Sequence, residues 1–245
     1  MKRKAILIGS PNVKPELPGV DIDLRDMSEY LQSNTGGAWK KDEITVLRNP
    51  SKLTVDVQLL LSRDADYVFI LCAGHGEHHI GANLSESVIY LQENEKMKIT
   101  DINPKNKRHL VVVDACRGIV RINEDLQKMA LNAKSESMMF GSVSNVDFRA
   151  EFDNAVMAAP EGRIVMYSCD IDQTAGDHGE GGVFTQSLLR SPAYFNNANS
   201  YGCTVVDCNE SFNVAKTVTY KQNAPQSPVL DAGRRMKFYP FSIVV

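Results

Sequence analysis

Short apolar runs bounded by polar or turn residues recur along the chain. Such runs are typical of strands buried on both faces of a parallel sheet, whereas a strand with one wet face alternates apolar and polar positions. The pattern predicts five buried strands, at residues 4–8, 43–47, 67–73, 109–114 and 163–168.

Apolar residues at helical spacing separate these runs. Leu24, Met27 and Leu31 recur at steps of three and four residues, which predicts a helix over residues 21–33. Val55 and Leu59 indicate a second helix before the third strand. Strands that alternate with helices predict an α/β fold with right-handed crossovers. Further helices are expected over residues 182–189 and 205–221, and a last strand, interrupted by Pro240, over 237–244.

Two stretches interrupt the alternation of strands and helices. Residues 76–107 hold Gly, Asn, Glu and Lys around one strand candidate, which predicts a hairpin excursion beyond the sheet. Residues 119–162 begin with a predicted helical piece at 123–134 and continue with Ser-, Asn- and Met-rich chain. A connection of this length is unusual in a compact domain, so we expect a possible regulatory loop at 119–162.

Composition and charge exclude several classes of function. The 245 residues are enough for one large domain, and 43% of them are hydrophobic, which excludes a disordered chain. A net charge of −3 argues against a nucleic-acid partner. The first apolar run is too short for a signal peptide and no run is long enough to span a membrane. Five cysteines without a CxxC pair favour a reducing, cytoplasmic location.

Two of the predicted strands end in polar motifs that carry candidate chemistry. The third strand runs into His75-Gly76 and the fourth into Asp114-Ala-Cys116. Because the carboxyl ends of parallel strands face one crevice, we expect His75 and Cys116 to meet there. A neighbouring imidazole can activate a cysteine thiol as a nucleophile and later protonate a leaving amine. Gly76 permits close substrate approach, and its N–H and that of Cys116 are candidates for an oxyanion hole.

The motifs Ala-Gly-His75-Gly and Asp114-Ala-Cys116-Arg-Gly resemble those that carry the catalytic histidine and cysteine of caspases and metacaspases. The resemblance extends to residues 17–23, 167–175, 181–185 and 226–228. It implies a single peptidase domain over residues 1–245 with a caspase-like three-layer sandwich, in which helices flank a mostly parallel sheet of about six strands. The activity it implies is that of a cysteine endopeptidase.

The resemblance also implies a substrate pocket. Metacaspases carry aspartates at the positions of Asp23 and Asp114, and an acidic pocket would select a protein or peptide substrate with Lys or Arg before the cleaved bond. Ala73 departs from the family, which commonly has serine there, and leaves the charge of the pocket unchanged. Without the resemblance, both aspartates also have a purely structural interpretation. Asp23 would be a carboxylate that is stabilised near a helix N-terminus, and Asp114 would be a hydrogen-bond acceptor at a strand end.

Other interpretations of these residues are weaker. His75-Gly-Glu77-His78-His79 fits no zinc-protease helix, so we expect no metal site and treat His78 and His79 as solvated loop residues. Calcium, which metacaspases commonly need, is not expected, because the acids after His75 are scattered. No cofactor is predicted, and an activating ligand or partner protein stays open. The alternatives are a catalytically silent binding or scaffold module and another cysteine hydrolase on the same fold.

Overall fold

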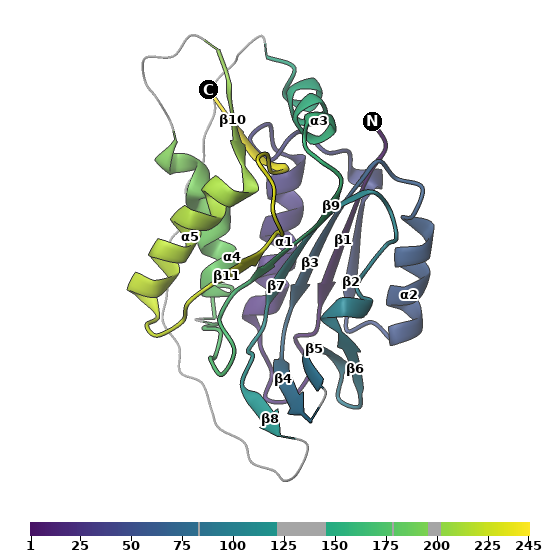
Figure 1. The fold of residues 1–245 in the computed structure, drawn as a ribbon, viewed down its shortest axis with the longest axis vertical. Coiled ribbons are helices and arrows are strands. Elements are labelled where there is room, and N and C mark those ends of the chain that lie inside the picture. Colours follow the sequence, from purple (N-terminus) through teal and green to yellow (C-terminus); the bar gives the residue numbers. More distant parts are fainter. Residues whose placement is uncertain (83, 122–145, 178, 196–201) are drawn as a thin grey trace.

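A six-stranded sheet forms the centre of the computed structural model, which describes residues 1–82, 84–121, 146–177, 179–195 and 202–245 (Figure 1). Its strands are β1 (Arg3–Gly9), β2 (Ile44–Arg48), β3 (Tyr67–Ala73), β7 (Arg108–Asp114), β9 (Gly162–Tyr167) and β11 (Val229–Asp231). They lie in the order β11, β9, β7, β3, β1, β2, and only β11 at the edge pairs antiparallel. The five predicted strands and the mostly parallel sheet are confirmed.

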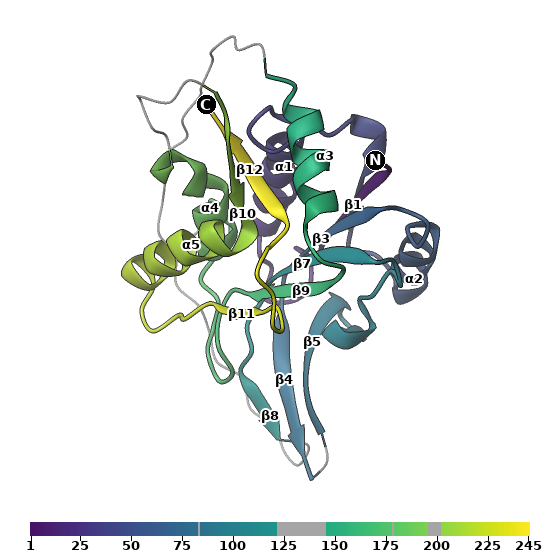
Figure 2. The same ribbon diagram turned by 45° about the horizontal axis from the view of Figure 1, so that its top comes forward.

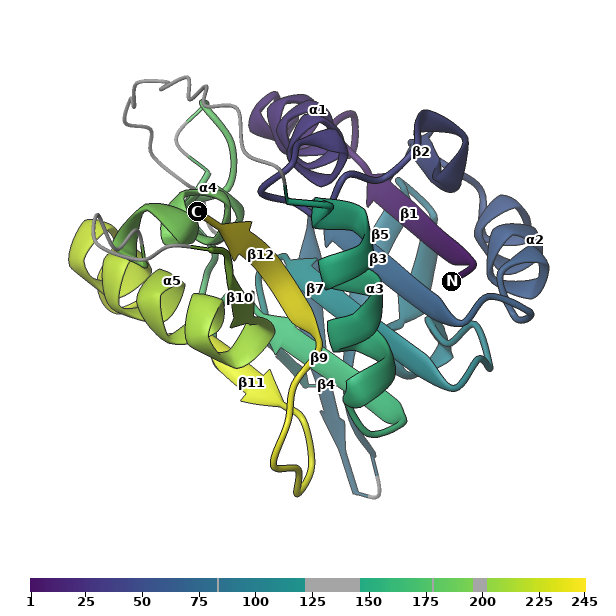
Figure 3. The ribbon, with the colours of Figure 1, turned by 90° about the horizontal axis from the view of Figure 1, so that it is seen from above.

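Helices cover both faces of this sheet (Figure 3). They are α1 (Gly19–Gln32), α2 (Lys52–Leu61), α3 (Phe148–Ala158), α4 (Val183–Arg190) and α5 (Cys208–Gln222). Alternate residues of β1 point to opposite faces of the sheet and belong to two separate hydrophobic cores. Leu7 lies in the core that includes residues of α1, α3, α4 and α5, whereas Ile6 and Ile8 lie in the core that includes residues of α2. The resulting layers confirm the predicted α/β sandwich. None of the described helices is long and apolar enough to cross a membrane.

A second, four-stranded sheet projects from one end of the molecule (Figure 2). It contains β4 (Gly76–Gly81), β5 (Leu84–Gln92), β6 (Glu95–Lys98) and β8 (Ile119–Arg121), in the order β6, β5, β4, β8. Its strands β4, β5 and β6 form the hairpin excursion predicted at residues 76–107, and β8 adds a fourth strand from beyond that range. Among the described residues, short 3-10 helices occur at Lys41–Glu43, Ile99–Asp101 and Ser191–Tyr194.

The predicted helix over 205–221 starts too early. Residues Thr204–Asp207 form a strand, β10, which pairs antiparallel with β12 (Pro240–Val244) in a separate two-stranded sheet. The helix begins only at Cys208 because the Asp207 side chain accepts hydrogen bonds from Asn209 N and Glu210 N, both at 2.9 Å. Such a cap fixes the first helical residue more strongly than apolar periodicity does. The last predicted strand, 237–244, is likewise shorter and begins at Pro240.

The described parts of segment 119–162 contain regular elements near both ends. Its start is β8, which pairs with β4, and its end contains α3. The sequence analysis missed α3, although Phe148, Phe152 and Val156 recur at steps of four residues and are all buried. The predicted helical piece at 123–134 lies outside the described residues.

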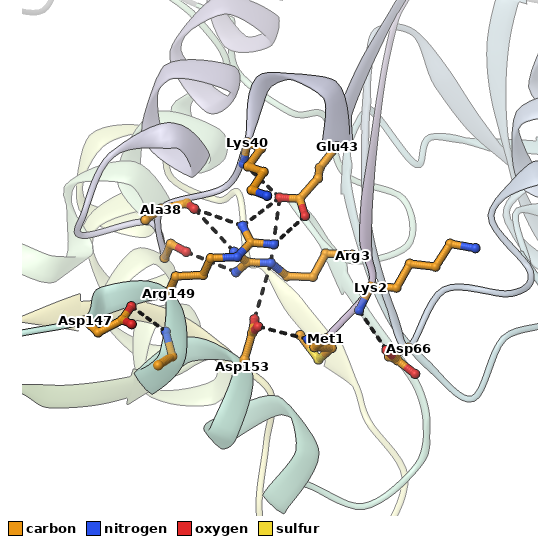
Figure 4. A network of polar contacts seen from close by, with 12 residues as sticks. Met1, Lys2, Arg3, Ala38, Lys40, Glu43, Asp66, Asp147, Arg149 and Asp153 are labelled. Atoms are coloured by element: carbon orange, nitrogen blue, oxygen red, sulfur yellow. Dashed lines mark hydrogen bonds and ion pairs between the residues drawn. The ribbon is translucent and has the colours of Figure 1, made fainter.

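A buried polar network ties α3 to the first strand (Figure 4). Arg3 is 1% exposed, its Cζ lies 4.6 Å from the ring centre of Trp39 and 5.3 Å from that of Phe152, and its Nε is 3.4 Å from Asp153 Oδ1. Arg149 of α3 donates to Glu43 Oε2 at 2.9 Å. These contacts, together with its apolar face, anchor α3 to the N-terminal half of the chain.

Candidate active site

Strands β3 and β7 are neighbours in the middle of the central sheet, and their carboxyl ends lie side by side. The two strands pair in parallel, and their last residues, Ala73 and Asp114, are register partners. His75 and Cys116 each follow two residues later. The topology therefore delivers both candidate catalytic residues to the same edge, where the sequence analysis expected them.

Gly76 brings the chain after His75 directly against Cys116. A Cβ atom at Gly76 would lie 2.7 Å from Cys116 O and 2.8 Å from the Cβ of Ala115. No larger residue fits without moving the backbone of the candidate nucleophile. The need for glycine at this position thus comes from a close approach of two backbones.

The imidazole of His75 is held by a backbone carbonyl. His75 Nε2 lies 2.6 Å from Pro15 O, in the loop between β1 and α1. A carbonyl oxygen can only accept, so Nε2 carries a hydrogen, which in the neutral imidazole leaves the lone pair on Nδ1. The half-buried ring therefore has one nitrogen occupied by the protein and one available as a proton acceptor.

The thiol of Cys116 is half-buried and contacts the segment after β9. Ala175 N donates to Cys116 Sγ at 3.3 Å. Burial raises the pKa of the Cys116 thiol, the Ala175 N–H opposes this, and the charge of Asp114 adds to the rise. The thiol is therefore protonated at neutral pH and needs a base to become a nucleophile. Among the described residues, no hydrogen bond joins the side chains of His75 and Cys116, and such catalytic bonds often tighten only when substrate binds.

Asp23 and Asp114 are both buried and both accept hydrogen bonds from the start of α4. Asp114 Oδ2 accepts from Thr185 N at 2.9 Å and from Thr185 Oγ1 at 2.7 Å. Asp23 Oδ2 accepts from Gly182 N at 2.8 Å, and its Oδ1 accepts from Gln186 Nε2 at 3.1 Å. All of these donors are neutral groups.

The two carboxylates face each other across Gly182. A Cβ atom there would lie 2.3 Å from Asp114 Oδ2 and 3.1 Å from Asp23 Oδ2. Burial raises the pKa of both carboxyl groups, and the charge of Asp114 raises that of Asp23 further. The predicted pocket residues are therefore together in space, with the buried Ala73 beside Asp114.

A third carboxylate, Asp177, completes this group and was missed by the sequence analysis. Asp177 forms a β-bridge with Gly182, and its charge raises the pKa of both Asp23 and Asp114. Unlike the other two it is half-buried, and its Oδ1 accepts a hydrogen bond from Gly179 N at 2.8 Å. It lies just beyond the 167–175 motif, but spacing alone does not show that the following loop folds back over Asp114. We call Asp23, Asp114 and Asp177 the acidic cluster.

His78 and His79 are not solvated loop residues, contrary to the sequence-based expectation. Both belong to β4, and His78 is 3% exposed. His78 Nδ1 lies 2.9 Å from Ser87 Oγ, and burial lowers the pKa of His78. His79 Nε2 lies 2.5 Å from Glu77 Oε1. The alternation of a paired strand, which places every second side chain inward, was not apparent from this Gly-rich stretch.

The residues present do not fit a calcium or zinc site. Within the described ranges, no three His, Cys, Asp or Glu side chains are grouped so as to hold a metal ion. Of the acids after His75, Glu86 is ion-paired with Lys98 at 3.0 Å, and Glu93 and Glu95 accept backbone N–H groups. All five cysteines are free thiols.

Comparisons with known proteins agree with this arrangement. The family model described as "Caspase domain" matches residues 2–239. Caspase-1 from Spodoptera frugiperda has a similar structure, with a TM-score of 0.59 and 14% sequence identity over 97% of this chain and 89% of that one. No curated protein sequence matches. Because the family match spans almost the whole chain and the fold is that of a caspase, the chain belongs to the caspase family of cysteine proteases.

Proposed function

We propose that the chain is an endopeptidase that works through a dyad of Cys116 and His75. His75 Nδ1 removes the thiol proton, and the sulfur attacks the carbonyl carbon of the scissile peptide bond. The tetrahedral intermediate expels the amine, to which His75 delivers that proton. Water then attacks the thioester, His75 takes up a proton from it, and the proton returns to the departing sulfur. Free enzyme and two peptides result.

The close backbone approach of Gly76 to Cys116 supports a role for these residues beyond the dyad. Their N–H groups are the candidate donors to the oxyanion of the tetrahedral intermediate. Donors that are held in place before the reaction stabilise this charge without reorganising. A single such donor is typically worth about 3–4 kcal/mol.

We further propose that the enzyme cleaves after Arg or Lys. The observation that carries this specificity is the acidic cluster beside the candidate nucleophile, with its neutral hydrogen-bond donors. The negative charges of the three carboxylates repel one another, which helps to raise the pKa of Asp23 and Asp114, and a guanidinium or ammonium group relieves the repulsion. A substrate aspartate would add a fourth negative charge, so cleavage after Asp is disfavoured.

Turnover of three matched fluorogenic peptides, which differ only in Arg, Lys or Asp before the cleaved bond, tests the proposal. We expect turnover of the Arg and Lys peptides and none after Cys116→Ala or His75→Ala. Cys203→Ala is the control, because Cys203 is also half-buried but packs against the apolar core. Full activity of folded Cys116→Ala would refute the dyad, and preference for the Asp peptide would refute the specificity.

The second candidate function is a binding module that has kept the fold and lost the chemistry. It predicts that wild-type protein binds the Arg peptide without cleaving it. The intact pair of His75 and Cys116 favours the enzyme over this alternative.

A free thiol at each cysteine also supports the expectation of a reducing compartment.

A further inference from the structure

Tyr90, on β5, contacts the candidate general base, His75, through both its ring and its backbone. The rings of His75 and Tyr90 meet edge to face, with centroids 6.4 Å apart and planes at 78°. Tyr90 N also donates to His75 O at 3.0 Å. One residue therefore touches both the backbone and the imidazole of His75.

Tyr90 is itself fixed at three points. Its hydroxyl donates to Glu77 Oε2 at 2.6 Å, and Lys96 Nζ lies 4.3 Å above the centre of its ring. Lys96 Nζ is also 2.6 Å from Glu77 Oε1, the oxygen that His79 contacts. A tyrosine held by its hydroxyl, its ring face and its backbone N–H has little freedom to rotate.

Around neutral pH the Glu77 carboxyl stays ionised and the Tyr90 hydroxyl stays protonated. Burial raises the pKa of Glu77, but hydrogen bonds from Lys96, Tyr90 and His79 outweigh it and lower the pKa overall. Burial and the bond to Glu77 raise the pKa of Tyr90, so its hydroxyl stays a donor. The Tyr90–Glu77 hydrogen bond is thus charge-assisted, the stronger kind.

We propose that Tyr90, held by Glu77, is a positioning residue that sets the orientation of the His75 imidazole. The inference rests on the proposed function, in which His75 is the general base. Pro15 O fixes His75 at Nε2, and the Tyr90 ring limits rotation about the remaining side-chain torsion. In this proposal Nδ1 is the nitrogen left to face Cys116, which follows the neighbouring strand β7.

Loss of Tyr90 is expected to lower turnover more than substrate binding. A misplacement of about 1 Å can cost up to roughly a hundredfold in rate, because proton transfer depends steeply on geometry. We expect Tyr90→Leu to lower kcat about tenfold, and Tyr90→Phe and Glu77→Gln about threefold, with KM changed less than about twofold. Glu86→Gln is the matched control: Glu86 lies on the same sheet, pairs with a lysine, and has the same 13% side-chain exposure as Glu77.

A second readout separates positioning of His75 from general damage to the site. Iodoacetamide alkylates Cys116 without using the substrate pocket, and mass spectrometry of the Cys116 peptide gives its rate. Tyr90→Leu should slow this alkylation in the wild-type background. In the His75→Ala background the same substitution should have no further effect, because the base that it positions is absent.

Each outcome decides one of the two claims. The positioning role is overturned if folded Tyr90→Leu keeps kcat within about twofold of wild type, or if it slows alkylation equally with and without His75. If Tyr90→Leu does not fold, Tyr90→Phe and Glu77→Gln are judged by the same two criteria. Wild-type turnover by His75→Ala would instead refute the dyad itself.

Discussion

Asp23→Asn separates the charge of the acidic cluster from its shape. Asp23 is 2% exposed, and its two oxygens accept hydrogen bonds from Gly182 N and Gln186 Nε2. Asparagine has the same size and keeps one oxygen that can accept from Gly182 N. The substitution therefore removes a negative charge while leaving the packing around α1 and α4 nearly unchanged.

The loss of activity follows from the hydrogen bonds that a substrate cation would make. A hydrogen bond to a charged group contributes about 1.5–3 kcal/mol net. Removing one of three carboxylates is therefore expected to cost about 2 kcal/mol of transition-state binding, which corresponds to about a thirtyfold loss in kcat/KM for an Arg peptide.

Although Asp23→Asn should lower activity, it should raise the thermal stability of the fold at neutral pH. Burial and the charge of Asp114 raise the pKa of Asp23 in the folded protein. The folded state then binds the Asp23 proton more tightly than the unfolded chain, so this carboxyl stabilises the fold at low pH. That contribution is lost as the pH rises through the folded pKa. Above this pH the Asp23→Asn variant, which is neutral at this position, should melt at a higher temperature than wild type, and the difference should shrink toward acid pH.

The assay combines turnover of an Arg peptide with thermal melting across the pH range. Asp21→Asn is the control, because Asp21 lies on the same helix but is exposed and pairs with Arg48 at 2.7 Å. A variant at position 23 that cleaves the Arg peptide as fast as wild type, or that melts lower than wild type at every pH, would refute the account of the cluster.

Three further predictions concern the cluster, calcium and the segment after Cys116. Gly182→Ala should abolish cleavage after Arg, measured as peptide turnover, because the new methyl would lie 2.3 Å from Asp114 Oδ2. Calcium added to chelator-treated enzyme should not change turnover, and a large gain would show that prediction wrong. Mass spectrometry should find self-cleavage after Arg121, Lys128 or Lys134 in wild type and not in Cys116→Ala. Arg149 should stay uncut because it is helical and ion-paired with Glu43, and identical fragments in both proteins would exclude self-processing.

Apolar runs predicted the central sheet well because its inner strands β1, β3 and β7 are buried on both faces. Leu7 and Ile8 show why: they point to opposite faces of β1 and both find a core there, so both must be apolar. The edge strand β11 has only three residues and no such run, and it was missed. The helix boundary at Asp207 was missed because a side-chain cap decided it rather than periodicity.

The candidate site was predictable where it follows strand ends and not where it depends on loops. The register of β3 with β7 places Ala73 and Asp114 together, and with them His75 and Cys116. Asp177 joins the acidic cluster only because the chain folds back to bridge Gly182. The contact of Tyr90 with His75 likewise depends on how β5 pairs with β4, which the sequence of the hairpin did not fix.

Covalent labelling of the thiol tests the central claim most directly. Wild-type protein is incubated with a peptide that ends in an Arg chloromethyl ketone, and in parallel with the matched Asp reagent, and the modified residue is identified by mass spectrometry. We expect one adduct, at Cys116, which forms with the Arg reagent, fails with the Asp reagent, and is slowed by His75→Ala. Modification of another cysteine, or faster labelling by the Asp reagent, would contradict the proposed Cys116–His75 dyad and its acidic specificity cluster.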